Sequence, residues 1–113
     1  MSDNTMIPAA EARPLRALIT PTDQGIASRI LARTAGGTVT LFAFDADQEL
    51  SEHSTPFEAL VLVLEGAIRV TVGETPMTAV PGTIVRMPAN VPHALHALEP
   101  ARMLLIMLRE SKT

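Results

Sequence analysis

From Gly25 onward, the chain is a succession of short apolar runs that are separated by turn residues. Short runs bounded by Gly, Pro, Asn and Asp are typical of β-strands. So many short strands in so few residues predict an all-β sandwich or barrel. We expect strands at 26–33, 38–44, 58–64, 67–72, 76–80, 83–87, 93–98 and 102–109, and a loop at the polar stretch 45–52.

The first 24 residues differ from the rest of the chain. Pro8, Pro14 and Pro21 break any long helix there, although a short apolar segment lies between the last two. We therefore expect an N-terminal arm over 1–24, followed by one β-barrel over 25–113. The 113 residues fit a single domain that can bury a core of its own.

Composition excludes several classes of partner. The net charge is −3 and no cluster of basic residues is present, so we expect no nucleic-acid binding. The longest apolar runs, 59–64 and 103–108, are too short to cross a membrane. There is no Cys, and the first residues have no basic region followed by an apolar run, so we expect a cytoplasmic protein.

The run 58–64 is apolar on both faces. Ala59, Val61 and Val63 would lie on one face of a strand, and three leucines on the other. A barrel interior covers only one of these faces, so another layer must cover the leucines. We expect a homodimer in which the partner subunit covers them, with the N-terminal arm as the rival cover. The arm itself is a candidate to pack on the partner.

Two segments about thirty residues apart carry the most specific pattern. The first is the run His53-Ser-Thr-Pro-Phe-Glu-Ala, which leads into Leu64-Glu-Gly66; the second is Gly82, five residues, Pro88-Ala-Asn, two residues and His93. Together they resemble the two sequence motifs of the cupin family, over most of the chain from about residue 38 to 108. The resemblance implies a cupin-type double-stranded β-helix, which is an RmlC-like jelly-roll barrel, with the N-terminal arm attached.

The resemblance also implies where a metal would bind. Motif 1 of cupins usually supplies two histidines and a carboxylate or glutamine, and motif 2 supplies a third histidine. Here His53 and His93 are present, whereas Thr55 and Ala59 stand at the other two positions. The motif is degenerate, so three readings of the two histidines stay open: a divalent ion such as Ni, Zn, Mn or Fe, a polar patch in a ligand pocket without metal, or a core role.

Strand parity assigns the remaining side chains. His53, Thr55 and Ala59 share a parity, and we expect them to face one pocket, with His93 opposite them across the barrel interior. Met87 could line the same pocket, although methionines on strands more often pack in a core. Glu58 and His96 have the opposite parity and are expected to point away. No nucleophile stands out, so no catalytic residue is assigned.

Two functions follow. The first is a dimeric binding module that holds a small, mostly apolar ligand in the barrel interior. The alternative is a metal-dependent cupin enzyme of oxygenase or isomerase type, which needs a bound ion with open coordination positions.

Overall fold

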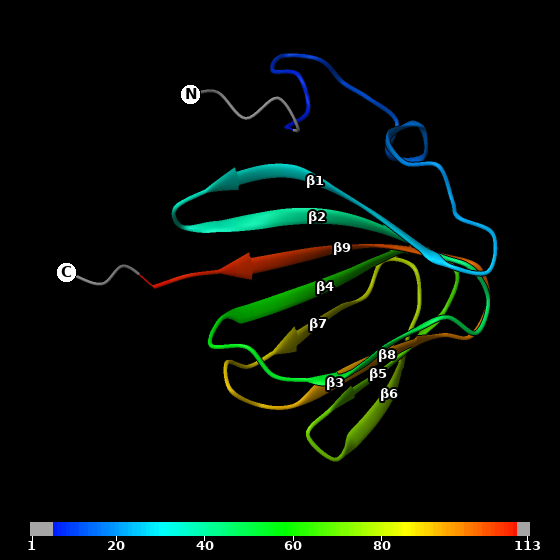
Figure 1. Cartoon of the computed structure of the whole chain (residues 1–113), viewed down its shortest axis with the longest axis vertical. Helices are drawn as coiled ribbons and strands as arrows, with labels where there is room; N and C mark the ends of the chain where they lie inside the picture. The colour runs from blue at the N-terminus through cyan, green and yellow to red at the C-terminus, as the bar shows by residue number, and fades with distance from the viewer. Residues whose placement is uncertain (1–5, 111–113) are drawn as a thin grey trace.

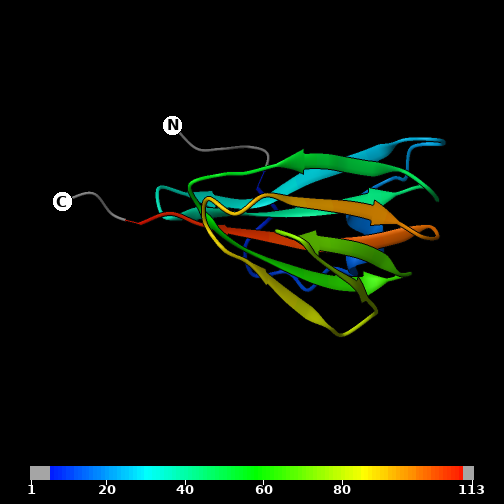
Figure 2. The same ribbon diagram turned by 90° about the horizontal axis from the view of Figure 1, so that it is seen from below.

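Residues 6–110, the part of the chain that the computed structural model describes, form nine β-strands and one short 3-10 helix. The strands make two antiparallel sheets that lie one above the other (Figures 1 and 2). The expected all-β class is therefore confirmed. Within the same range, the structure has no helix of the length and apolar character needed to cross a membrane.

The first sheet has five strands in the order β1-β2-β9-β4-β7. Every neighbouring pair is antiparallel, and β1 and β2 form the expected hairpin, which closes at the pair Thr34 and Gly37. The bounds are Ile26–Thr34 for β1, Gly37–Phe44 for β2, Glu58–Glu65 for β4, Ile84–Met87 for β7 and Ala101–Leu108 for β9.

The second sheet has four strands in the order β3-β8-β5-β6. Their bounds are Glu49–His53 for β3, Ile68–Val72 for β5, Thr75–Ala79 for β6 and His93–Ala97 for β8. The central strand β5 alternates as its sequence predicts: Ile68 and Val70 are fully buried, whereas Arg69 is exposed. One face of this sheet therefore meets the core and the other meets solvent.

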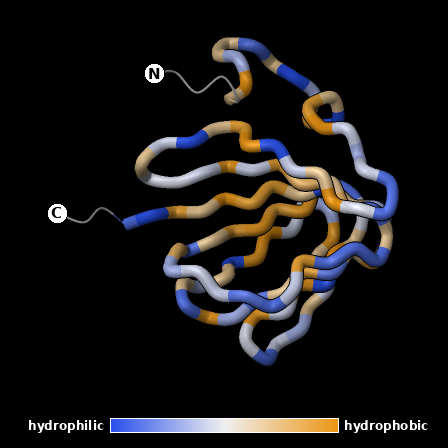
Figure 3. The backbone as a smooth tube through the Cα atoms, in the orientation of Figure 1, coloured by the Kyte–Doolittle hydropathy of each residue, from blue (hydrophilic) through white to orange (hydrophobic). Residues whose placement is uncertain are grey.

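The core lies between the two sheets. Strand β4 places Ala59, Val61 and Val63 in it, each 2% exposed or less, and β9 adds Met103 at 0%. Figure 3 shows the hydrophobic residues concentrated along β4 and β9 in the middle of the first sheet. Burial of this apolar surface is the main favourable term that holds the sheets together.

The N-terminal arm crosses the outer face of the first sheet (Figure 1). Its 3-10 helix, Leu15–Leu18, buries Leu18 against Leu31 and Leu41 of that sheet. Two hydrogen bonds fix the arm: the Ile7 N–H donates to the Leu31 carbonyl at 3.0 Å, and an Arg29 guanidinium N–H donates to the Leu18 carbonyl, also at 3.0 Å. The arm thus covers part of the outer apolar face of its own chain.

Strand β3 corrects the prediction of a loop over 45–52. It is an edge strand, and four of its five side chains are exposed while Leu50 is half-buried. Hydrophobic alternation is the signal by which a strand is recognised, and an edge strand that buries one side chain gives almost none. This correction matters for function because β3 ends at His53.

Candidate functional site

His53 and His93 come together at one end of the second sheet. His53 ends β3, His93 begins β8, and the two residues are directly paired in the ladder between these strands. Their imidazole rings meet edge to face, with centroids 4.5 Å apart and ring planes at 71°. We expected the rings to face each other across the barrel interior. They are instead neighbours in one sheet, because β3 pairs with β8, with a register shift between Leu50 and His53.

Backbone carbonyls fix which nitrogen of each ring carries the proton. The Nδ1 atom of His53 lies 2.8 Å from the Ser51 carbonyl oxygen, and the Nδ1 atom of His93 lies 3.3 Å from that of Val91. A carbonyl oxygen only accepts, so each Nδ1 donates a proton to it. In the neutral rings both Nε2 atoms therefore keep a lone pair, which can bind a metal or accept a hydrogen bond.

The two rings differ in exposure. His93 is 5% exposed, whereas His53 is exposed at the rim. Burial lowers the pKa of His93 below its usual 6.5, and the nearby charge of His53 lowers it further, against a smaller opposing effect from the hydrogen bond to the Val91 carbonyl. His93 is therefore neutral at pH 7, which is the form that keeps its Nε2 lone pair.

The three other residues expected at the pocket lie in different surroundings. Thr55 is half-buried in the loop between β3 and β4, and its hydroxyl lies 3.4 Å from both the N–H and the carbonyl of Phe57. Ala59 and Met87 are directly paired between β4 and β7 and are 2% and 1% exposed. Both belong to the packed core between the sheets.

A carboxylate holds the loop that leads to His93. Glu58 lies on the opposite face of β4 from Ala59, as parity predicts, and its two oxygens accept hydrogen bonds from the Ala89 N–H and the Arg86 Nε–H, each at 2.7 Å. The hydrogen bond from Ala89 is the largest cause that lowers the pKa of Glu58, and the hydrogen bond from Arg86 is the next. The Asn90 N–H adds a 2.7 Å bond to the Thr55 carbonyl. The segments that carry the two histidines are therefore joined.

His96 lies apart from this pair. It alternates with the buried His93 and Leu95 along β8 and so faces the other side of the sheet. Its Nε2 atom is 3.4 Å from an Asp47 carboxylate oxygen, and its Nδ1 atom is 3.8 Å from one of Glu49. It is thus a matched control histidine on the same strand.

Comparison with known proteins places this arrangement in a family. The model of the cupin domain family matches residues 40–107, which is more than half of the chain. The chain belongs to the cupin family. Its two antiparallel sheets are accordingly the cupin jelly roll that the two motifs imply.

Solved structures agree with this assignment. The cupin resembles a conserved protein of unknown function from Streptococcus pyogenes, with 30% identity, a TM-score of 0.90, and 99% of this chain and 98% of that one covered. It also resembles a cupin superfamily protein from Desulfitobacterium hafniense, with 26% identity, a TM-score of 0.86, and coverage of 95% and 97%. A search of curated proteins finds no match.

The donor set of this cupin falls short of a metal centre held by the protein alone. Protein metal sites for first-row ions usually have three or four protein ligands. Between Met6 and Glu110, no group of three or more His, Cys, Asp or Glu side chains is placed to hold an ion. The Thr55 hydroxyl is turned to the backbone of Phe57, and Ala59 offers no donor. Two imidazoles remain, fewer than the three or four protein ligands that such ions usually have.

Sequence reasoning missed two parts of this site. It placed Glu58 away from the pocket without identifying its bond to the Ala89 N–H. It also gave no role to the carbonyls of Ser51 and Val91, because hydrogen bonds from a histidine to a backbone carbonyl two residues before it leave no mark in residue types. The residue type at position 90 did carry a signal, because Asn tolerates a positive φ better than most residues. Asn90 has a φ of +65° in the structure.

Proposed function

We propose that this cupin is a binding module that holds a small, mostly apolar molecule with one hydrogen-bond donor, at the end of the barrel where His53 and His93 meet. The observation that supports the proposal is the pair of imidazoles in contact, each with its Nδ1 atom directed at a backbone carbonyl. An Nε2 atom that carries no proton can accept a hydrogen bond from an N–H or O–H group.

The surroundings of the rings support an apolar body for this ligand. Val72 is the direct partner of His93 on β5, and Leu50 is paired with Leu95, which is two residues from His93 on β8. Both side chains are half-buried and pack against the core. Small-molecule sites usually combine such apolar walls with a few oriented polar groups.

A metal-dependent enzyme is the second candidate, and the two Nε2 lone pairs are what favours it. Imidazole suits nickel, zinc and iron, but a substrate or water would have to complete the coordination. Metal analysis of protein purified without a His-tag separates the two functions. A stoichiometric transition metal would favour the enzyme, whereas a metal-free protein with a bound organic molecule would favour the binding module.

The binding itself is tested with phenol as the probe and toluene as its donor-free control. Phenol should shift the imidazole Cε1–H signals of His53 and His93 in NMR spectra, and toluene should shift them far less. His53→Ala and His93→Ala should each weaken phenol binding more than His96→Ala, which removes a histidine from the other face of β8. Equal effects of the three substitutions would refute the site.

A further inference from the structure

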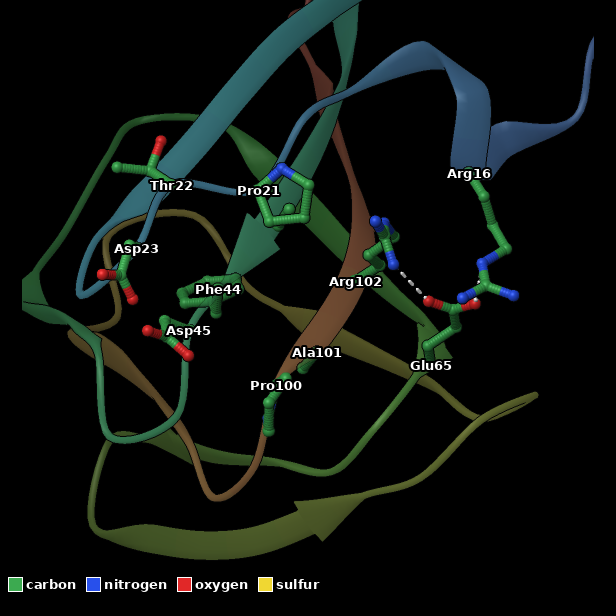
Figure 4. A pocket seen from close by; sticks show the side chains of 11 residues that line it. Arg16, Pro21, Thr22, Asp23, Phe44, Asp45, Glu65, Pro100, Ala101 and Arg102 are labelled. Atoms are coloured by element: carbon green, nitrogen blue, oxygen red, sulfur yellow. Dashed lines mark hydrogen bonds and ion pairs between the residues drawn. The ribbon is translucent and has the colours of Figure 1, made fainter.

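A cavity lies outside the barrel, between the N-terminal arm and the end of the first sheet (Figure 4). Its volume is about 460 Å³, which is within the range of small-molecule sites. The arm forms one wall with residues 16 and 21–23, and the end of β2 and the start of β9 form the other. The histidine pair takes no part in it.

One side of the cavity holds more positive than negative charge. Arg102 places Nη1 at 2.6 Å from one oxygen of Glu65, and Arg16 places Nε at 3.0 Å from the other. Two guanidinium groups thus share one carboxylate. The Nε atom of Arg102 is buried and has no hydrogen-bond partner among the described residues. A buried donor without an acceptor is costly. An anion bound beside this guanidinium would supply the missing hydrogen-bond acceptor.

The other side of the cavity is acidic. Figure 4 shows Asp23 and Asp45 together, across the cavity from Arg16 and Arg102. The Asp45 carboxylate accepts hydrogen bonds from the Gln24 N–H at 2.7 Å and the Ala46 N–H at 2.8 Å. These two bonds keep the pKa of Asp45 below its usual value, and the bond from Gln24 has the larger effect. Asp45 is therefore a charged acceptor in a fixed position.

Apolar groups separate the two charged sides. Phe44, Pro21 and Ala101 lie between them in Figure 4. We propose that this cavity binds a small zwitterion, with an ammonium group at Asp23 and Asp45, a carboxylate at Arg16 and Arg102, and a short apolar chain between. The proposal concerns a site separate from the histidine pair and stands independently of it.

The test uses a series of ω-amino acids on the full chain: 4-aminobutanoate, 5-aminopentanoate and 6-aminohexanoate. Pentylamine and pentanoate serve as controls that each carry one of the two charges. One member of the series should bind at least about tenfold more tightly than both controls, a difference of about 1.4 kcal/mol. Its binding should shift the backbone amide signals of Ala46 and Arg102 and leave the imidazole signals of His53 and His93 in place. The proposal fails if no member binds, or if a control binds as tightly as the best zwitterion.

Substitutions at exposed positions provide variants that should fold. The Arg16 side chain is 76% exposed, and Arg16→Gln should weaken zwitterion binding by about threefold, the scale of an exposed ion pair. Asp23→Asn should also weaken zwitterion binding, because it removes a negative charge from the acidic side of the cavity. Arg13→Gln is the charge-matched control, because Arg13 is exposed, pairs with Glu11 and lies outside the cavity. An equal loss in Arg13→Gln would show that only net charge matters and would overturn the site.

Discussion

His93 presents its imidazole to that of His53 at a centroid distance of 4.5 Å, with one ring buried and the other exposed. Two rings this close cannot both become protonated without repulsion. Binding at the pair should therefore depend on pH.

The first prediction concerns this pH dependence. His93 should titrate below its usual value of 6.5, and His53→Ala should raise its pKa, because the substitution removes the neighbouring charge and opens the ring to water. Titration of the imidazole Cε1–H signals by NMR measures both effects. A His93 pKa at or above 6.5 in the unmodified protein would contradict the prediction.

The same shift links pH to stability. The unfolded chain binds a proton at His93 more readily than the folded protein does, so the free energy of unfolding should fall as the pH drops below about 6.5. Urea unfolding at pH 7.5 and pH 5.5 measures this change. His93→Gln should show a smaller difference between the two pH values.

The second prediction concerns the carboxylate that joins the two histidine segments. Glu58→Gln keeps the size of the side chain but removes the charge that binds both the Ala89 N–H and Arg86. Hydrogen exchange at the amides of Ala89 and Asn90 should become severalfold faster, because charge-assisted hydrogen bonds are stronger than neutral ones. The control is Glu74→Gln, an exposed glutamate in the turn between β5 and β6. Unchanged exchange in Glu58→Gln would mean that the loop is held without this carboxylate.

Much of this fold could be predicted from residue types. Turn residues marked the ends of most strands, and the alternation in β5 correctly identified its buried face. The strand β3 could not be found in this way, because it buries little and its position depends on pairing with the distant β8. Periodicity describes one strand at a time, whereas pairing between distant strands is a property of the whole fold.

The same limit applies to the site. The two motifs predicted that His53 and His93 lie together, and the structure pairs them because β3 is an edge strand beside β8. Parity also grouped Thr55 and Ala59 with them. In the structure Thr55 lies in the loop that separates β3 from β4, and β4 places Ala59 in the core between the two sheets. Parity holds only within one continuous strand.

The third prediction compares two motif glycines that both have positive φ. At Gly66 (φ +74°) an added Cβ would lie 2.3 Å from the Pro100 carbonyl oxygen, whereas at Gly82 (φ +85°) it would meet nothing within 4 Å. Gly82→Ala should therefore cost only the conformational strain, about 1–2 kcal/mol. Gly66→Ala should cost about 1–3 kcal/mol more, because the backbone itself must move. Urea unfolding of both variants measures the difference, and equal losses would contradict the close approach at Gly66.

The last prediction concerns the outer apolar face of the first sheet. On this face, Leu64 and Leu104 pack against the cluster that contains Leu18 of the N-terminal arm. Beyond the arm, Leu62 is paired with Ile84, which is 57% exposed, and β9 ends at Leu108, which is 49% exposed. We expect a second copy of the chain to cover this remaining part, so that the protein is a homodimer.

Light scattering at micromolar concentration should give about twice the chain mass of 12.1 kDa. Leu62→Glu should produce monomers or aggregates, because it places a charge in an interface without water. Thr78→Glu is the matched control, since Thr78 is an exposed strand residue of the other sheet. A monodisperse monomer in the unmodified protein would refute the homodimer, and dissociation of Thr78→Glu to the same extent would place the interface elsewhere.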